Sequence, residues 1–269
     1  MDFETLRVTL QDHVAHIELN RPTRLNAINV VMKRELHQVF DRIDTDDDIG
    51  AVVVSGAGRA FSAGMDLKDD AAGSTEGVAA WRQALAGDLA VIMRFWDSPK
   101  PTIAAVHGFC LAAACELSMA CDVTIAEEGC YLGEPELRFG SVITAMLMPM
   151  ITGPKIAKEL LLAADDRITA ERAERIGLVN RVVPAGTGVA AALAMARRMA
   201  SFDRDGVRLT KEAINRSCDA MGLREALRAN LDLAVQIECL ETPSRKAFKD
   251  LTRSQGLKAA LEWRDRRAG

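Results

Sequence analysis

The sequence predicts a wound α/β core built from strand-then-helix units, followed by a helix-rich C-terminal region. Over the first 150 residues, short β-branched runs alternate with amphipathic helical segments. These units resemble one another in plan but not in sequence. After about residue 150 helical periodicity dominates, and no low-complexity linker intervenes. We therefore expect residues 1–200 to form the core with the active site, and residues 201–269 to form a helical region packed against it.

The elements of the first half follow from periodicity. Residues 8–20 alternate apolar and polar side chains, which predicts a hairpin of two strands. Apolar side chains at helical spacing predict two amphipathic helices, the second ending at Pro99. Their apolar faces contain Met32, Leu36, Val39, Phe40 and Ile43 in the first helix, and Leu85, Leu89, Ile92 and Phe95 in the second. Buried strands are expected at 51–56 and 101–108, a short buried helix at 111–121, and strand and loop at 121–137.

The second half is predicted to be mainly helical. Residues 157–177 form one helical run, and residues 177–183 are typical of a further strand. Further helices are expected at 187–200, 206–218, 222–240 and 254–267. Leu223, Leu227 and Leu231 are four residues apart. This stripe could dock on another surface or on the core of its own chain, and the sequence leaves both open.

Composition narrows the class of protein. A hydrophobic fraction of 49% and a charged fraction of 27% are ordinary for a globular protein. The net charge of −4 gives no reason to expect nucleic acid as a partner. None of the six cysteines forms a CxxC pair, so we expect buried free thiols in a reducing compartment. The charged N-terminal segment has no apolar signal core, and the expected location is cytoplasmic.

A carboxylate lies within the most apolar part of the chain. Between residues 103 and 126 only Glu116 and Asp122 carry formal charge. A membrane span is disfavoured, because the segment consists of alanine, cysteine and glycine rather than leucine. A central Glu would also cost about 2.5 kcal/mol or more to insert. An unpaired buried carboxylate is costly, so Glu116 is either compensated locally or kept for chemistry.

Two short segments could each direct a backbone N–H at one ligand oxygen. FSAGMD (61–66) contains a glycine that lets the backbone approach closely, and LAAACE (111–116) leads into a helix with free N–H groups. Two such donors would stabilise an enolate oxygen. The residues alone also allow a simple turn and a close helix packing. Likewise Glu116 could simply interact favourably with the helix dipole, and Glu136 could pair with Arg138. Alternatively, Glu116 and Glu136 could act as acid and base around a water.

The sequence lacks the motifs that are typical of several other enzyme classes and of metal sites. The chain has no GxSxG, GxGxxG or GxxxxGK motif, which removes the signals for a hydrolase triad and for the common nucleotide sites. The four histidines do not have metal-ligand spacing. His107, which precedes a glycine at a strand end, is expected to be structural. We therefore expect neither a metal nor a redox cofactor.

Five segments in the right order resemble the enoyl-CoA hydratase/isomerase (crotonase) family. They are LNRPTRLNAIN, GAGRAFSAGMDLK, VHGFCLAAACELSMACD, GEPELRFG and DRITAERAERIGLVNRVVP. The resemblance implies a crotonase-like spiral of ββα turns with a helical C-terminal trimerisation region, assembled as homotrimers or dimers of trimers. It also implies an oxyanion hole formed by the N–H groups of Met65 and Ala113, with Glu116 and Glu136 as the catalytic pair.

The same resemblance implies an acyl-CoA thioester substrate, with CoA entering only as part of that substrate. Arg24 is expected to meet the CoA phosphates, and the backbone from Ala63 to Leu67 its adenine and pantetheine. The expected substrate-binding set is Arg24, Leu25, Ala27, Ala63, Gly64, Asp66, Leu67, Leu111, Pro135, Gly140 and Thr144. Retention of both glutamates favours a 2-enoyl-CoA hydratase. The alternatives are a double-bond isomerase that uses Glu136 alone, and a catalytically silent acyl-CoA-binding or RNA-binding relative.

The chain departs from the family pattern at two places. Ala112, Ala113 and Ala114 stand where glycines are usual, and their methyl groups could tighten the oxyanion hole. Residues 140–150 read GSVITAMLMPM in place of a glycine-rich turn. That segment borders the acyl pocket in the family. We therefore expect its bulky side chains, among them Ile143, Met146 and Leu147, to disfavour long straight acyl chains.

Overall fold

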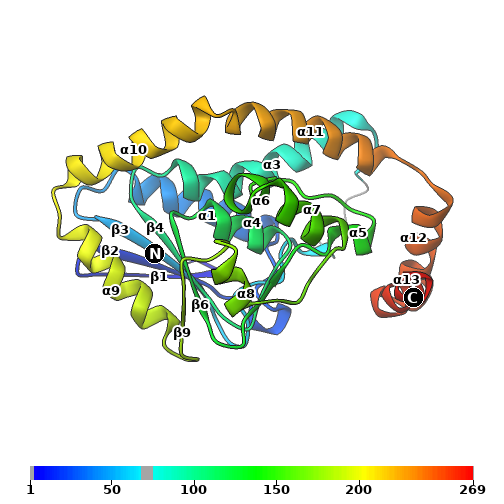
Figure 1. Ribbon diagram of the computed structural model, residues 1–269, viewed down its shortest axis with the longest axis horizontal. Helices are drawn as coiled ribbons and strands as arrows, with labels where there is room; N and C mark the ends of the chain where they lie inside the picture. The colour runs from blue at the N-terminus through cyan, green and yellow to red at the C-terminus, as the bar shows by residue number, and fades with distance from the viewer. Residues whose placement is uncertain (1–2, 68–74, 269) are drawn as a thin grey trace.

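The fold is built on a six-stranded, mostly parallel sheet with helices on both faces (Figure 1). The computed structural model describes residues 3–67 and 75–268. The main sheet has the order β1-β2-β3-β4-β6-β9, in which only the β1–β2 hairpin is antiparallel, and a second sheet has the order β5-β7-β8. The strands are β1 (Leu6–Gln11), β2 (Val14–Leu19), β3 (Ala51–Gly56), β4 (Thr102–Val106), β5 (Phe109–Leu111), β6 (Val123–Glu127), β7 (Tyr131–Gly133), β8 (Ile168–Thr169) and β9 (Arg181–Val183).

The continuous apolar run of β3 is explained by burial of both faces of the sheet. Val52 and Val54 belong to the main core with α1, α3 and α4, whereas Ala51 and Val53 pack in a second cluster with α9. Alternate side chains of a strand point to opposite faces, so a strand covered on both sides shows no polar alternation. The predicted hairpin, buried strands and wound α/β order are therefore confirmed.

The helices agree with the predicted pattern in the first half and depart from it in the second. They are η1 (Pro22–Arg24), α1 (Val30–Ile43), α3 (Val78–Asp97), α4 (Ala113–Ala120), α5 (Glu136–Phe139), α6 (Met148–Thr152), α7 (Pro154–Leu162), α8 (Ala170–Arg175), α9 (Gly188–Ala200), α10 (Arg204–Ala220), α11 (Leu223–Cys239), α12 (Pro243–Gln255) and α13 (Leu257–Ala268). The single run expected over 157–177 is wrong. Ala164 takes a left-handed φ of 52°, which ends α7, and Ile168 then pairs with Leu132 of β7.

Besides the short η1 and α5, the helices α6 and α12 were not predicted. α12 begins at Pro243, after Thr242 caps it by accepting a hydrogen bond from the N–H of Arg245. Its sequence is largely polar and only Phe248 is buried, so its apolar periodicity is weak. α6 begins inside the 140–150 segment, for which no helix was predicted. Proline near the first position of each helix is a start signal that periodicity alone does not use.

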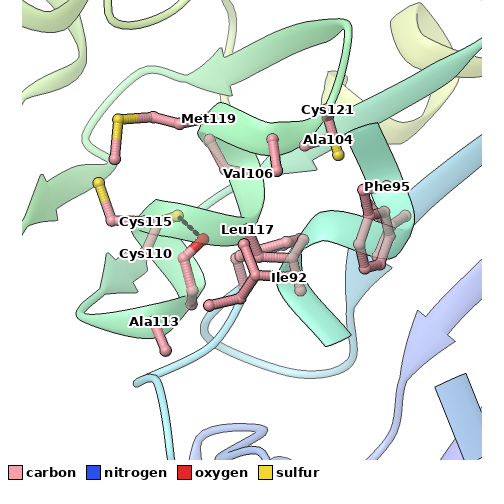
Figure 2. Packing of buried hydrophobic residues seen from close by; sticks show 14 of the residues in the cluster. Ile92, Phe95, Ala104, Val106, Cys110, Ala113, Cys115, Leu117, Met119 and Cys121 are labelled. Carbon is pink, nitrogen blue, oxygen red and sulfur yellow. Dashed lines mark hydrogen bonds between the residues drawn. The ribbon is translucent and has the colours of Figure 1, made fainter. Parts of the chain in front are cut away.

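The helix α4 is buried on every side, and it carries Glu116. All eight of its residues are buried. Figure 2 shows Leu117 of α4 packed near Ile92 of α3, within the cluster that also holds Val106 of β4. The six cysteines are free thiols, four of them buried. The expectation that all six are buried is wrong, because Cys239 at the end of α11 is exposed.

Of the C-terminal helices, α11 packs on the chain's own core. α10 and α11 run in succession along one side of the molecule, and α12 and α13 lie at its far end (Figure 1). Leu223 and Leu227 are buried in the main core, and Leu231 packs beside Leu85 of α3. Of the two interpretations of this stripe, the one that docks it on its own chain is confirmed. The division at residue 200 stays a prediction. Among the residues that the structure describes, no helix is both long and apolar enough to span a bilayer.

Candidate active site

Two backbone segments that are far apart in the sequence meet at Gly64. Isolated bridges join Met65 to Ile28 and Ser62 to Cys110. The loop that contains Gly64 therefore lies between the segment that precedes α1 and β5. Gly64 has a φ of 89°, and a Cβ placed on it would lie 2.6 Å from the Cβ of Ala112 and 3.1 Å from the nitrogen of Ala113. Glycine is required both for this conformation and for this approach.

The N–H groups of Met65 and Ala113 are without hydrogen-bond acceptors in the described part of the chain. Ala113 is the first residue of α4, where N–H groups have no partner within the helix. Ala112 precedes it with φ 57° and ψ −136°, a conformation that glycine adopts more readily. The structure thus brings the two predicted donors to adjoining segments.

A buried asparagine that the sequence analysis did not select holds this loop in place. Asn26 is fully buried, and its side-chain amide donates to the carbonyls of Ala57 and Ala60 at 2.8 Å each. The hydroxyl of Ser62 donates back to the Asn26 carbonyl at 2.9 Å. Asn26 has a left-handed φ of 52°, which asparagine tolerates better than most residues. A signal was available, because asparagine in a polar loop is typical of such positions.

Glu116 points into the interior from the first turn of α4. It is 1% exposed, and its Oε1 accepts a hydrogen bond of 2.7 Å from the N–H of Thr144. Its Oε2 has no partner among the described residues. Burial raises the pKa of Glu116 to about 7, while the N–H groups of Ala145 and Thr144 partly oppose the shift. A carboxyl with this pKa can both accept and release a proton near neutral pH.

Glu136 is the first residue of α5 and is also buried, at 7% exposure. Arg138 does not pair with it and instead contacts Asp166 and Asp265, so the surface-pair interpretation of Glu136 is wrong. The pKa of Glu136 is raised well above its ordinary value, first by burial and then by the nearby charge of Glu116. Its Oε2 is also unpartnered in the part of the chain described.

Glu134 is a third carboxyl group at this place, and the sequence analysis missed it. It is 1% exposed, and neither of its side-chain oxygens has a hydrogen-bond partner within residues 3–67 and 75–268. Glu116, Glu134 and Glu136 each offer an oxygen, and these three atoms lie within 4.8 Å of one another. Its position beside Pro135 in GEPEL gives no local sign of burial, so sequence reasoning had no signal for it. As three carboxylate oxygens, this group could also ligate a cation.

Residues 140–150, which depart from the family pattern, are held against the carboxyl cluster by contacts on two sides. Its Thr144 N–H reaches Glu116, and the amide of Asn230 in α11 donates to the carbonyls of Ile143 and Thr144 at 3.0 Å each. Ile143 and Leu147 are buried in the main core, whereas Met146 is partly buried against it. The C-terminal region therefore fixes the loop that supports Glu116.

The predicted substrate-binding residues occupy different environments. Arg24 and Leu67 are exposed, and the N–H of Ala63 donates to the carbonyl of Leu25, which places the two expected CoA segments side by side. The carboxylate of Asp66 pairs with Arg21 at 2.8 Å. The buried members are Ala27, Gly64, Asp66, Pro135 and Thr144, and the half-buried ones are Leu25, Ala63, Leu111 and Gly140. Gly140 differs from the rest because it lies beside Arg264 of α13.

Known proteins are similar to this chain in both sequence and fold. The profile of the family described as Enoyl-CoA hydratase/isomerase matches residues 9–265. A probable enoyl-CoA hydratase of Rhizobium meliloti is 39% identical over 85% of this chain and 87% of its own. The human mitochondrial Delta(3,5)-Delta(2,4)-dienoyl-CoA isomerase is 35% identical over 78% of this chain and 68% of its own.

The crystal structure of an enoyl-CoA hydratase/isomerase from Xanthobacter autotrophicus Py2 is 46% identical and covers 99% of both chains, with a TM-score of 0.96. The match extends over the carboxylate cluster and the two N–H segments, as does the family profile. The chain therefore belongs to the enoyl-CoA hydratase/isomerase family.

Proposed function

We propose that the protein is a 2-enoyl-CoA hydratase, which adds water across the α,β double bond of an enoyl-CoA thioester. One observation carries the proposal: Glu116 and Glu136 converge in a buried site, each with a carboxyl oxygen that no group of the described chain satisfies. Hydration needs a base for the water and an acid for the α-carbon, and two carboxyl groups supply both. An isomerase needs only one.

The reaction begins with the thioester carbonyl, whose oxygen accepts hydrogen bonds from the N–H groups of Met65 and Ala113. The water oxygen attacks Cβ while ionised Glu116 takes one water proton. The π electrons of the double bond move into an enolate, and the two N–H groups stabilise its oxygen. Protonated Glu136 then gives its proton to Cα. Water is thereby added in full. Proton exchange then removes the proton from Glu116 and returns one to Glu136, which restores the starting protonation of the site.

The environments of the two carboxyl groups support this division of roles. Glu116 is held by the N–H of Thr144, which favours its charged form. For Glu136, burial and the charge of Glu116 raise the pKa well above the ordinary value, which favours the protonated form. Two titratable groups with environments that separate their protonation states are typical of an acid and base pair.

The proposal includes the binding of CoA and the assembly. Arg24 meets the CoA phosphates, and the backbone from Ala63 to Leu67 holds adenine and pantetheine. CoA is part of the substrate, and no separate cofactor takes part. The six free thiols support a cytoplasmic location. Trimers or dimers of trimers are supported by exposed apolar side chains on and beside α10, among them Phe202, Leu209 and Ile214.

The test compares Glu116→Gln and Glu136→Gln with the wild type. Loss of the conjugated enoyl-thioester absorbance reports hydration, and its appearance from a 3-enoyl-CoA reports isomerisation. Each proton-transfer group is worth about 10²- to 10⁴-fold, so Glu136→Gln should lower both activities by at least about 10²-fold. Glu116→Gln should lower hydration similarly and spare more of any isomerisation.

The matched control is Glu128→Gln, because Glu128 is an exposed carboxylate near the same part of the chain. It should leave both activities unchanged. A wild type that isomerises but never hydrates would make the isomerase, which has the human dienoyl-CoA isomerase as a relative, the correct assignment. A wild type without either activity would favour a catalytically silent acyl-CoA-binding protein.

A further inference from the structure

Three carboxyl groups, rather than two, surround one point in the site. Their nearest oxygens lie within 4.8 Å of one another. At the upper limit of 4.8 Å for all three separations, the centre of the triangle is about 2.8 Å from each corner, which is the ordinary length of an O–H···O hydrogen bond. One water molecule can therefore contact Glu116, Glu134 and Glu136 at the same time. The mechanism derived above uses only two of these groups and leaves Glu134 without a task.

Glu134 differs from its two neighbours in having nothing to stabilise a negative charge. Glu116 receives the N–H of Thr144, whereas both oxygens of Glu134 are unpartnered among the described residues. The titratable groups that face it are Glu116 and Cys115 of α4, Glu136 of α5 and Cys110 of β5, with Asp88 of α3 acting on Glu116. The groups with a resolved influence on it are therefore all neutral or acidic. Burial, followed by the charges of Glu136 and Glu116, raises the pKa of Glu134 well above its ordinary value.

We propose that Glu134, carrying a proton, is a third catalytic residue that donates its O–H to the oxygen of the attacking water. The hydrogen-bond capacity of water supports the assignment. A water molecule donates two hydrogen bonds, which ionised Glu116 and the carbonyl oxygen of protonated Glu136 can accept, and its oxygen has two lone pairs. If one lone pair accepts a hydrogen bond from the O–H of Glu134, the other is left to point at Cβ. The inference rests on the proposed function, since it concerns the water of the hydration step.

The distinguishing experiment replaces Glu134 with two residues of similar size. Glutamine matches a protonated carboxyl group because it keeps a donor, so Glu134→Gln should keep hydration within about fivefold of the wild type at neutral pH. Leucine has no donor, and losing a hydrogen bond in a buried site should lower kcat by at least about tenfold with little change in KM. Glu128→Gln is the exposed control, and circular dichroism establishes that each variant is folded.

The pH profile gives a second readout that a structural role would not move. The wild type should lose kcat at high pH as Glu134 and Glu136 ionise, and Glu134→Gln should retain only the loss that comes from Glu136. Infrared difference spectra give a third, since the carbonyl band of a protonated carboxyl group at neutral pH should be smaller in Glu134→Gln than in the wild type. This band is measured without turnover.

Each contrary outcome has a separate meaning. If Glu134→Gln loses as much hydration as Glu136→Gln, Glu134 acts as a charged group and the inference is wrong. Full activity in Glu134→Leu would show that it has no role. Saturable thermal stabilisation by Mg²⁺, Mn²⁺ or Ca²⁺ that disappears in Glu134→Gln would make the cluster a cation site instead. A wild type that hydrates no enoyl-CoA overturns the proposed function, and an unchanged infrared band overturns the protonation of Glu134 independently of it.

Discussion

Replacing Glu116 with glutamine should make the protein more stable while it destroys hydration. The folded protein holds the Glu116 proton more tightly than the unfolded chain does, because burial raises its pKa from 4.5 to about 7. The stability that comes from this proton is therefore complete below about pH 4.5 and is lost as the pH rises through about 7. Above that range the wild type carries a buried charge that glutamine does not have.

The size of the effect follows from the two pKa values. Relative to low pH, where both states are protonated, the raised pKa of Glu116 lowers the free energy of unfolding by about 1 kcal/mol at pH 5 and by about 3 kcal/mol at pH 8. Glutamine keeps an oxygen that can accept the Thr144 N–H, so the hydrogen bond of 2.7 Å need not be lost. Glu116→Gln should thus gain about 2 kcal/mol more over the wild type at pH 8 than at pH 5.

Urea unfolding at the two pH values measures this difference, with protein concentration held constant because assembly contributes to stability. Glu128→Gln serves again as the exposed control and should give equal, small changes at both pH values. A Glu116→Gln variant that is less stable than the wild type at pH 8, or whose gain is the same at both pH values, would refute the account of Glu116 as a destabilising buried charge.

The other predictions concern the oxyanion segments, the acyl loop and the assembly. Gly64→Ala should lower kcat by about 10²-fold, because its Cβ would lie 2.6 Å from that of Ala112 and move the Met65 N–H. Gly129→Ala is the control, since Gly129 also has positive φ but nothing within 4 Å of its Cβ position; equal losses in both variants would contradict the reasoning. Met146→Gly should raise kcat/KM for long straight-chain enoyl-CoAs relative to crotonyl-CoA, and a wild type that already prefers long chains would contradict this. Light scattering should give a mass near three or six times 29.2 kDa, and a clean monomer would exclude the proposed assembly.

The sequence was sufficient for the elements whose pattern reports burial directly. The hairpin, the apolar run of β3 and the helix α4 are set by local periodicity, and each is found where it was expected. The exposed, polar helix α12 was missed because little of it is buried, so it lacks an apolar face. The division of 157–177 was missed because Ala164 bends the chain to pair Ile168 with β7, a contact that only the tertiary structure specifies.

The site also contains residues that a local sequence pattern indicates and a residue that it does not. Glu116 was noticeable as a charge in an apolar segment, and Glu136 was weighed as a partner of Arg138 or of Glu116 before the family resemblance implied a catalytic role. Glu134 lies only two residues from Glu136, yet its ordinary surroundings in the sequence, next to Pro135, gave no sign of burial. What buries it is the second sheet, in which β7 lies between β5 and β8, together with the turn at Asp165, whose carbonyl accepts the Glu134 N–H. Such long-range covering cannot be deduced from a local pattern.

The burial that makes these carboxyl groups useful is also what makes them costly. An exposed glutamate would be ionised at neutral pH and could not deliver a proton to carbon, so the roles proposed for Glu134 and Glu136 require that both be removed from water. The chain places them against α4, a helix with no exposed face, and directs two N–H groups of the 140–150 segment, those of Ala145 and Thr144, at Glu116. In the proposed mechanism these donors help to separate the base from the acids. Asn230 of α11 donates to the carbonyl of that same threonine, so α11 supports the segment whose N–H groups favour the charged form of Glu116, the residue proposed to take the proton from water.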